Sequence, residues 1–141
     1  MLHKGAAGVK QMNSETYAAS CLCGAVRFAV VGPLPAPVAC HCFMCRKLSG
    51  HYEASLDVPR DRLLLTEVAQ VRWYASSKKV RRGFCGTCGS TLFFDPIHHD
   101  WIGISMGAFD TTTDTRLSLH IFTADKGDYY DIADGLPQNL Q

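Results

Sequence analysis

The segment Cys-Gly-Thr-Cys-Gly at residues 85–89 is the stretch of sequence that decides the fold. Two thiols separated by two residues, with glycines that permit a tight turn, are typical of one half of a structural zinc site. Another close pair, Cys21 and Cys23, stands directly before Gly24. In an extended chain, side chains two residues apart lie on the same side, so both sulfurs would face one ion. The two pairs together predict a closed Cys₄ zinc site that contributes folding energy.

A third group of cysteines lies between these pairs, at Cys40, Cys42 and Cys45. The chain has seven cysteines, so none remains as a fourth ligand for this group. A zinc ion with three protein ligands and one open position is typical of a reactive site. Two alternatives stay open: a histidine closes the site, or the thiols are reduced and empty. His41 is expected to point away from its neighbours Cys40 and Cys42, which makes it a poor ligand.

Composition predicts one soluble domain. The chain has 141 residues, of which 47% are hydrophobic and 19% are charged, and its formal net charge is +1. This balance gives no strong attraction to nucleic acid or to an acidic membrane. Residues 1–16 are small and polar and predict a loose N-terminal arm, followed by a single zinc-binding domain over residues 17–141. No signal peptide or membrane span is indicated, so we expect a cytoplasmic protein with reduced cysteines.

Hydrophobic periodicity predicts a mainly β fold. Residues 25–31 alternate between apolar and polar or small side chains, as a half-buried strand does. Further strands are predicted at residues 52–58, 63–66, 71–75, 80–84, 91–94, 101–106 and 117–122, each bounded by turn residues. Residues 43–48 predict one short helix, and the Pro-rich residues 32–37 a connector.

Several basic residues and histidines are candidates for substrate contact. Arg46 and Lys47 follow the middle cysteines, where they could offset thiolate charge or meet carboxylates of a ligand; an ordinary solvated pair is the alternative. His120, on a predicted strand, could act as an acid or base, or could be a satisfied buried side chain. The one basic run consists of Lys78, Lys79, Arg81 and Arg82. It favours a solvated strand face over a nucleic-acid surface.

Three motifs in order carry a family resemblance: C-x-C-G-A-V-R-F at residues 21–28, C-H-C-x-x-C-R-K-x-S-G at residues 40–50, and F-C-G-T-C-G-S-T-L-F-F at residues 84–94. The chain resembles the glutathione-dependent formaldehyde-activating enzyme family, and is also similar to the zinc domain of centromere protein V. The resemblance implies coiled antiparallel β-sheets pinned by a Cys₄ zinc. It implies Cys21, Cys23, Cys85 and Cys88 as ligands of the structural zinc and Cys40, Cys42 and Cys45 as ligands of a second, labile zinc.

The function that this resemblance implies is a zinc-dependent carbon–sulfur lyase or synthase. Its partners would be glutathione and formaldehyde, joined as S-(hydroxymethyl)glutathione, or a related small thiol adduct. The alternative is a non-enzymatic zinc module that contacts protein or nucleic acid. No Ser-His-Asp pattern or Gly-rich phosphate loop is present, which excludes several other enzyme classes.

Overall fold

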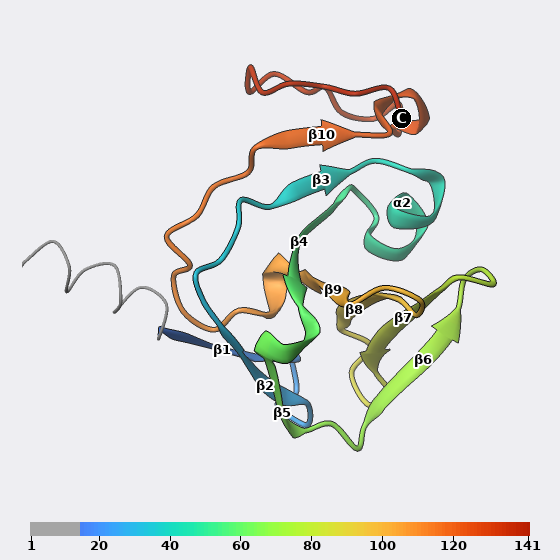
Figure 1. The fold of residues 1–141 in the computed structure, drawn as a ribbon. Helices are drawn as coiled ribbons and strands as arrows, with labels where there is room; N and C mark the ends of the chain where they lie inside the picture. The colour runs from blue at the N-terminus through green and yellow to red at the C-terminus, as the bar shows by residue number, and fades with distance from the viewer. Residues whose placement is uncertain (1–14) are drawn as a thin grey trace, which may run out of the picture.

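The computed structural model describes residues 15–141 and confirms a mainly β architecture, with two sheets and short helices (Figure 1). Residues 1–14, most of the expected N-terminal arm, lie outside the described residues. The first strand, β1 (Thr16–Ser20), begins at the last residue of that expected arm. Strand β1 was not predicted, because only Tyr17 and Ala19 are buried and the alternation is too short to read.

The smaller sheet has three antiparallel strands in the order β1-β2-β5, with β2 at Arg27–Val31 and β5 at Leu63–Glu67. The alternation predicted for residues 25–31 is present in β2, where Phe28 and Val30 are buried and Arg27 is exposed. One face of this sheet therefore packs inward and the other faces solvent, as period-two patterning requires.

The larger sheet has seven strands in the order β10-β3-β4-β9-β8-β7-β6. Their bounds are β3 Val38–Cys40, β4 Glu53–Pro59, β6 Val71–Ala75, β7 Val80–Cys85, β8 Thr91–Pro96, β9 Trp101–Ser105 and β10 Leu119–Ile121. All its neighbours are antiparallel except β10 and β3, which run parallel. Strand β3 was missed because three residues beside a Pro-rich connector carry no readable period.

The core lies between the two sheets. The rings of Phe28 on β2 and Phe93 on β8 meet with centroids 4.8 Å apart. Ile104 on β9 and Leu56 on β4 are buried in the same cluster. Burying each such side chain contributes about 1.5–3 kcal/mol, so this contact between sheets is the main apolar support of the fold.

The predicted helix is confirmed as α2 (Phe43–Ser49). Cys42 caps its first turn, since its Sγ accepts a hydrogen bond from the backbone N–H of Cys45. Gly50 ends it in the left-handed region, at φ 81°, where its N–H bonds to the carbonyl of Arg46. Short 3₁₀ turns follow β4, β9 and β10: η1 (Arg60–Arg62), η2 (Met106–Ala108) and η3 (Thr123–Asp125). No helix within residues 15–141 has the length and hydrophobicity to span a membrane.

A buried carboxylate near the end of β8 yields a stability prediction. Asp95 is 2% exposed and accepts hydrogen bonds from Arg60 and Arg81. Burial alone would raise the pKa of Asp95, but the hydrogen bonds from Arg60 and Arg81 hold it below its ordinary value of 3.8. We expect Asp95→Asn to lower the free energy of unfolding by about 2 kcal/mol at pH 7, because the charged hydrogen bonds to Arg60 and Arg81 are lost. The partial solvation of both arginines keeps this loss small.

The pH dependence of this effect follows from its sign. The depressed pKa stabilises the fold above the unfolded value and the contribution is lost as pH falls through the folded value. The difference between wild type and Asp95→Asn in urea unfolding should therefore shrink below about pH 3.8. Asp128→Asn, at an exposed position, serves as the control. A pH-independent difference would contradict this assignment.

Candidate metal centre

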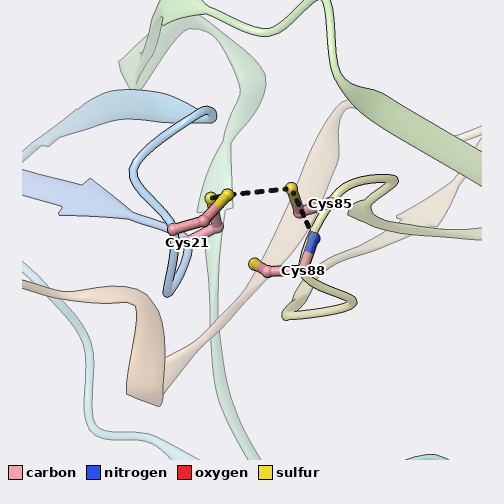
Figure 2. A group of neighbouring side chains, drawn as sticks. Cys21, Cys85 and Cys88 are labelled. Carbon is pink, nitrogen blue, oxygen red and sulfur yellow. Dashed lines mark hydrogen bonds between the residues drawn. The ribbon is translucent and has the colours of Figure 1, made fainter.

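Four thiols that are distant in sequence meet beside the core. The ligand atoms of Cys21, Cys23, Cys85 and Cys88 all lie within 4.8 Å of one another. Figure 2 shows Cys21, which follows β1, beside Cys85 at the end of β7 and Cys88 on the turn after it. Sulfur–sulfur distances are 3.6 Å for Cys21–Cys23 and 3.9 Å for Cys23–Cys85. Four ligands at 2.3 Å from one zinc ion would be about 3.8 Å apart, so the cluster fits a tetrahedral zinc.

The turn after β7 is built to hold two thiolates. The backbone N–H groups of Thr87 and Cys88 point at Cys85 Sγ from 3.3 and 3.4 Å. Gly89 adopts a φ of +83°, which only glycine takes without strain, and its N–H bonds to the Cys85 carbonyl. The Ser90 hydroxyl hydrogen-bonds Cys88 Sγ and lowers the pKa of Cys88 to about 5. These donors favour the charged form that a metal requires.

The turn after β1 achieves the same result by a different local shape. The extended conformation expected for Cys21 and Cys23 is wrong: the chain turns here, and Gly24 adopts a φ of +81°. The N–H of Val26 donates to Cys21 Sγ at 3.2 Å. Both sulfurs nevertheless reach the shared cluster, because the turn folds Cys23 back beside Cys21.

Three further thiols form a separate cluster. The sulfurs of Cys40, Cys42 and Cys45 lie within 4.8 Å of one another, and no fourth ligand atom joins them among residues 15–141. Cys40 ends β3, Cys42 caps α2, and Cys45 stands one helical turn later, so local geometry alone brings the three together. Cys45 is buried, whereas Cys40 and Cys42 are partly exposed. The donor set fits a thiolate-binding metal with an open position.

The electrostatics of this cluster also call for a cation. A hydrogen bond from the Cys45 thiol lowers the pKa of Cys40, and the same bond raises the pKa of Cys45. Cys40 therefore ionises readily to a thiolate, whereas Cys45 resists losing its proton. Because three thiolates at this separation repel one another, full ionisation needs a positive ion among them.

His41 points away from the cysteines, as its position between two of them predicts. Its ring is fully buried and hydrogen-bonds Tyr130 through Nδ1 and His120 through Nε2, the latter at 2.9 Å. His120 Nε2 in turn lies 2.8 Å from Asp134 Oδ2. Burial, followed by the nearby charge of His120, lowers the pKa of His41 to about 4. This chain of contacts joins the C-terminal segment, which lies beside β10 in Figure 1, to residues 40–45, which carry the three cysteines.

A cavity of about 520 Å³ opens beside the three-cysteine cluster, and all three of these cysteines line it. Volumes of several hundred Å³ are typical of small-molecule sites. The cavity also borders α2 and strands β3, β4, β7, β8, β9 and β10 of the larger sheet. The three thiols therefore face a space that a small molecule can enter.

Arg82 is the cation that lines this cavity, and the sequence did not single it out from its basic run. Its Nη1 lies 3.9 Å from Cys45 Sγ, and its guanidinium lies over the Phe94 ring, 5.1 Å from the centroid. The neighbouring Arg81 is bound to Asp95 instead. Alternation along β7 is the only sequence signal that separates these two arginines.

Glu53 is a second cavity residue that sequence reasoning missed. It is the antiparallel partner of Cys40 and accepts a hydrogen bond from the Ser105 hydroxyl. Burial raises the pKa of Glu53 above its ordinary value, with Ser105 and Arg82 acting in the opposite direction. A carboxyl group so placed is suited to hold or release a proton beside the thiols.

The three residues predicted for substrate contact do not line the cavity. Arg46 and Lys47 lie on α2 and stack against the ring of Phe43, 5.3 and 5.0 Å from its centroid. His120 is 2% exposed and is engaged with His41 and Asp134. The structure thus brings the seven cysteines into two clusters but leaves these three side chains outside the cavity wall.

Comparison with known proteins gives a consistent family match. The model of the family described as glutathione-dependent formaldehyde-activating enzyme matches residues 16–125. A Halomonas elongata protein, provisionally named a glutathione-dependent formaldehyde-activating enzyme, is 32% identical over 123 residues, covering 80% of this chain and 78% of that protein. A Schizosaccharomyces pombe protein named an uncharacterised lyase is 28% identical over 118 residues, covering 83% of this chain and 85% of that protein.

A solved structure shares the fold. The crystal structure of a Rhodobacter sphaeroides protein aligns with a TM-score of 0.56 and 19% sequence identity, covering 72% of this chain and 99% of that one.

Proposed function

Because the chain belongs to the glutathione-dependent formaldehyde-activating enzyme family, we propose that it is a zinc-dependent carbon–sulfur lyase or synthase acting on glutathione and formaldehyde, or on a related small thiol adduct. The observation that carries this proposal is the three-cysteine cluster, which has no fourth ligand among residues 15–141 and borders a cavity. Free thiols at all seven cysteines support a reducing compartment, for which we propose the cytoplasm.

The two cysteine clusters have different proposed roles. Cys21, Cys23, Cys85 and Cys88 would hold a structural zinc that joins the two sheets. Cys40, Cys42 and Cys45 would hold the second zinc, whose chemistry is to bind a substrate sulfur and favour its thiolate at neutral pH. Direct substrate contact by Arg46, Lys47 and His120 remains a prediction, and His120 also supports the position of His41, which lies between Cys40 and Cys42.

The chain's own residues then position the adduct and move its proton. Glu53, in its carboxylate form, accepts the hydroxyl proton of S-(hydroxymethyl)glutathione while the carbon–sulfur bond breaks. The carbon–oxygen double bond of formaldehyde forms, and the sulfur keeps the bonding electrons as thiolate. In the synthetic direction Glu53 returns the proton to the aldehyde oxygen, and Arg82 offsets negative charge beside Cys45.

We expect Arg82→Gln to weaken glutathione binding about tenfold, because a charge-assisted contact next to the substrate sulfur is lost. The measurement is the glutathione concentration that half-saturates exchange between free formaldehyde and its adduct, followed by NMR. Lys79→Gln makes the same charge change in the same basic run outside the cavity and should leave binding unchanged. Equal effects of the two variants would show that only long-range charge matters.

Glu53→Gln is expected to slow catalysed exchange at least tenfold, since general acid–base groups typically contribute more than this. Asp57 provides a matched carboxylate in the same cavity, four residues further along β4, or about 13 Å from Glu53. Asp57→Asn should therefore retain most of the exchange rate at saturating glutathione. Full activity of Glu53→Gln would remove Glu53 from the mechanism.

The overall proposal is tested by counting zinc per chain and by comparing the NMR exchange rate with the uncatalysed rate. Two zinc ions per chain and an acceleration proportional to protein concentration are expected. Because this addition also proceeds without a catalyst, the uncatalysed rate is the necessary control. A protein that holds two zinc ions but leaves the rate unchanged would favour the non-enzymatic interaction module.

A further inference from the structure

The cavity extends well beyond what formaldehyde requires. Glu53 and Ser105 line it beside the three thiols, and Trp101 lines it at the opposite end of β9, four residues before Ser105 and about 13 Å from it on an extended strand. Its volume is about 520 Å³, whereas about 150 Å³ is enough to hold a benzene ring. Formaldehyde contributes only a hydroxymethyl group to the adduct, so the size of the cavity must be explained by another part of the substrate.

The walls of this space are mainly apolar. Aliphatic and aromatic side chains from six elements face it, including Val38, Leu48, Val80, Phe94, Trp101 and Ile121. The Phe94 and Trp101 rings stack nearly parallel, at 12°, with centroids 6.1 Å apart. Phe122 also lines it and is held at a φ of 55°, which is rare for a bulky residue and often marks a functional site.

The charges in the wall do not match the peptide part of glutathione. That part carries two carboxylates and one ammonium group. The cavity offers one cation, Arg82, and two acidic side chains, Glu53 and Asp57. Placing several charges without partners against apolar side chains costs free energy. Burying an alkyl or aryl group there makes the free energy of binding more favourable.

We propose that this cavity binds the apolar group of a larger aldehyde, so that the preferred substrate is a hemithioacetal formed from a thiol and an alkyl or aryl aldehyde. This inference rests on the proposed function and names the carbonyl substrate class of the same site. The sulfur lies at the three-cysteine end and the aldehyde's apolar group extends toward Trp101. In synthesis, the thiolate sulfur bonds the aldehyde carbon, the carbonyl electrons move to oxygen, and Glu53 protonates that oxygen.

The first test measures binding with unreactive probes. S-hexylglutathione and S-methylglutathione share the peptide and differ only in five methylenes, each of which contributes about fourfold in affinity when buried. Calorimetric titration of the zinc-loaded protein should show S-hexylglutathione binding at least tenfold more tightly. The chain has two tryptophans, so a Trp73→Phe background leaves Trp101 as the single tryptophan, and with excitation selective for tryptophan the hexyl probe alone should shift its emission.

Two leucines give a matched pair of variants. Leu48 on α2 lines the cavity and Leu64 on β5 does not, yet both are 47% exposed. Leu48→Asp should weaken S-hexylglutathione at least fivefold and leave S-methylglutathione unchanged, while Leu64→Asp should affect neither. Because Leu48 is half-exposed, the variant is expected to fold, which circular dichroism checks.

The second test compares NMR exchange rates for the glutathione adducts of benzaldehyde, hexanal and formaldehyde. Greater acceleration of the larger adducts supports the inference. Equal binding of the two probes, or no binding of either, overturns it. Preferred binding of the hexyl probe without acceleration of any adduct would refute the proposed catalytic function and leave the apolar binding site standing.

Discussion

Replacing Cys42 by Ser is expected to leave a folded protein with one zinc ion per chain and no acceleration of adduct exchange above the uncatalysed rate. Removing one of three thiols leaves two protein ligands, too few to retain zinc at an open site. The fold should survive, because Cys42 is the N-cap of α2 and Ser is a preferred N-cap residue. Zinc counting, thermal unfolding and NMR exchange on one preparation measure all three outcomes.

The zinc content and the stability of Cys42→Ser together test whether the three-cysteine site is open and whether it is structural. Two zinc ions in Cys42→Ser would show that another side chain completes the second site, which contradicts an open position. Loss of the fold would show that the cluster is structural. Met44→Leu, in the same helix between Cys42 and Cys45, controls for general disturbance of α2 and should keep both zinc ions.

The same chemical change in the other cluster should have the opposite effect. Cys85→Ser is expected to lower the unfolding midpoint by at least about 10 °C, because the variant loses a zinc ligand and puts a hydroxyl in the core. Structural zinc sites supply about 10–16 kcal/mol in small domains, comparable with the whole stability of a typical protein. Differential scanning calorimetry of wild type, Cys85→Ser and chelator-treated wild type makes the comparison.

An unchanged unfolding midpoint in Cys85→Ser, together with full zinc content, would contradict the structural assignment. Chelation provides an independent check that needs no substitution. A strong chelator should remove the second zinc first, with the fold intact, and unfold the protein only when the four-cysteine site is emptied. Simultaneous loss of both ions would show that the two sites do not differ in their affinity for zinc.

Local sequence patterns predicted most of the strands. Alternation and bounding turn residues together predicted eight of the strands, and the alternation is clearest in β2, where Phe28 and Val30 are buried. It could not find β3, whose three residues depend on pairing with β4 and β10. The parallel pairing of β10 with β3 was equally hidden, since parallel neighbours are set by the path of the chain between them.

Spacing along the chain predicted two cysteine pairs and one group of three, because residues this close in sequence come together locally; the meeting of the two pairs in one cluster requires the long-range contact between Cys23 and Cys85. The residues around the second cluster could be identified only from the folded chain. Arg82, Glu53 and Trp101 come from different strands, and the local sequence does not show that their side chains line one cavity. Their positions in the cavity depend on which strands are neighbours in the sheet and on which face of the sheet each side chain lies. Both are set by packing between segments that are distant in the chain.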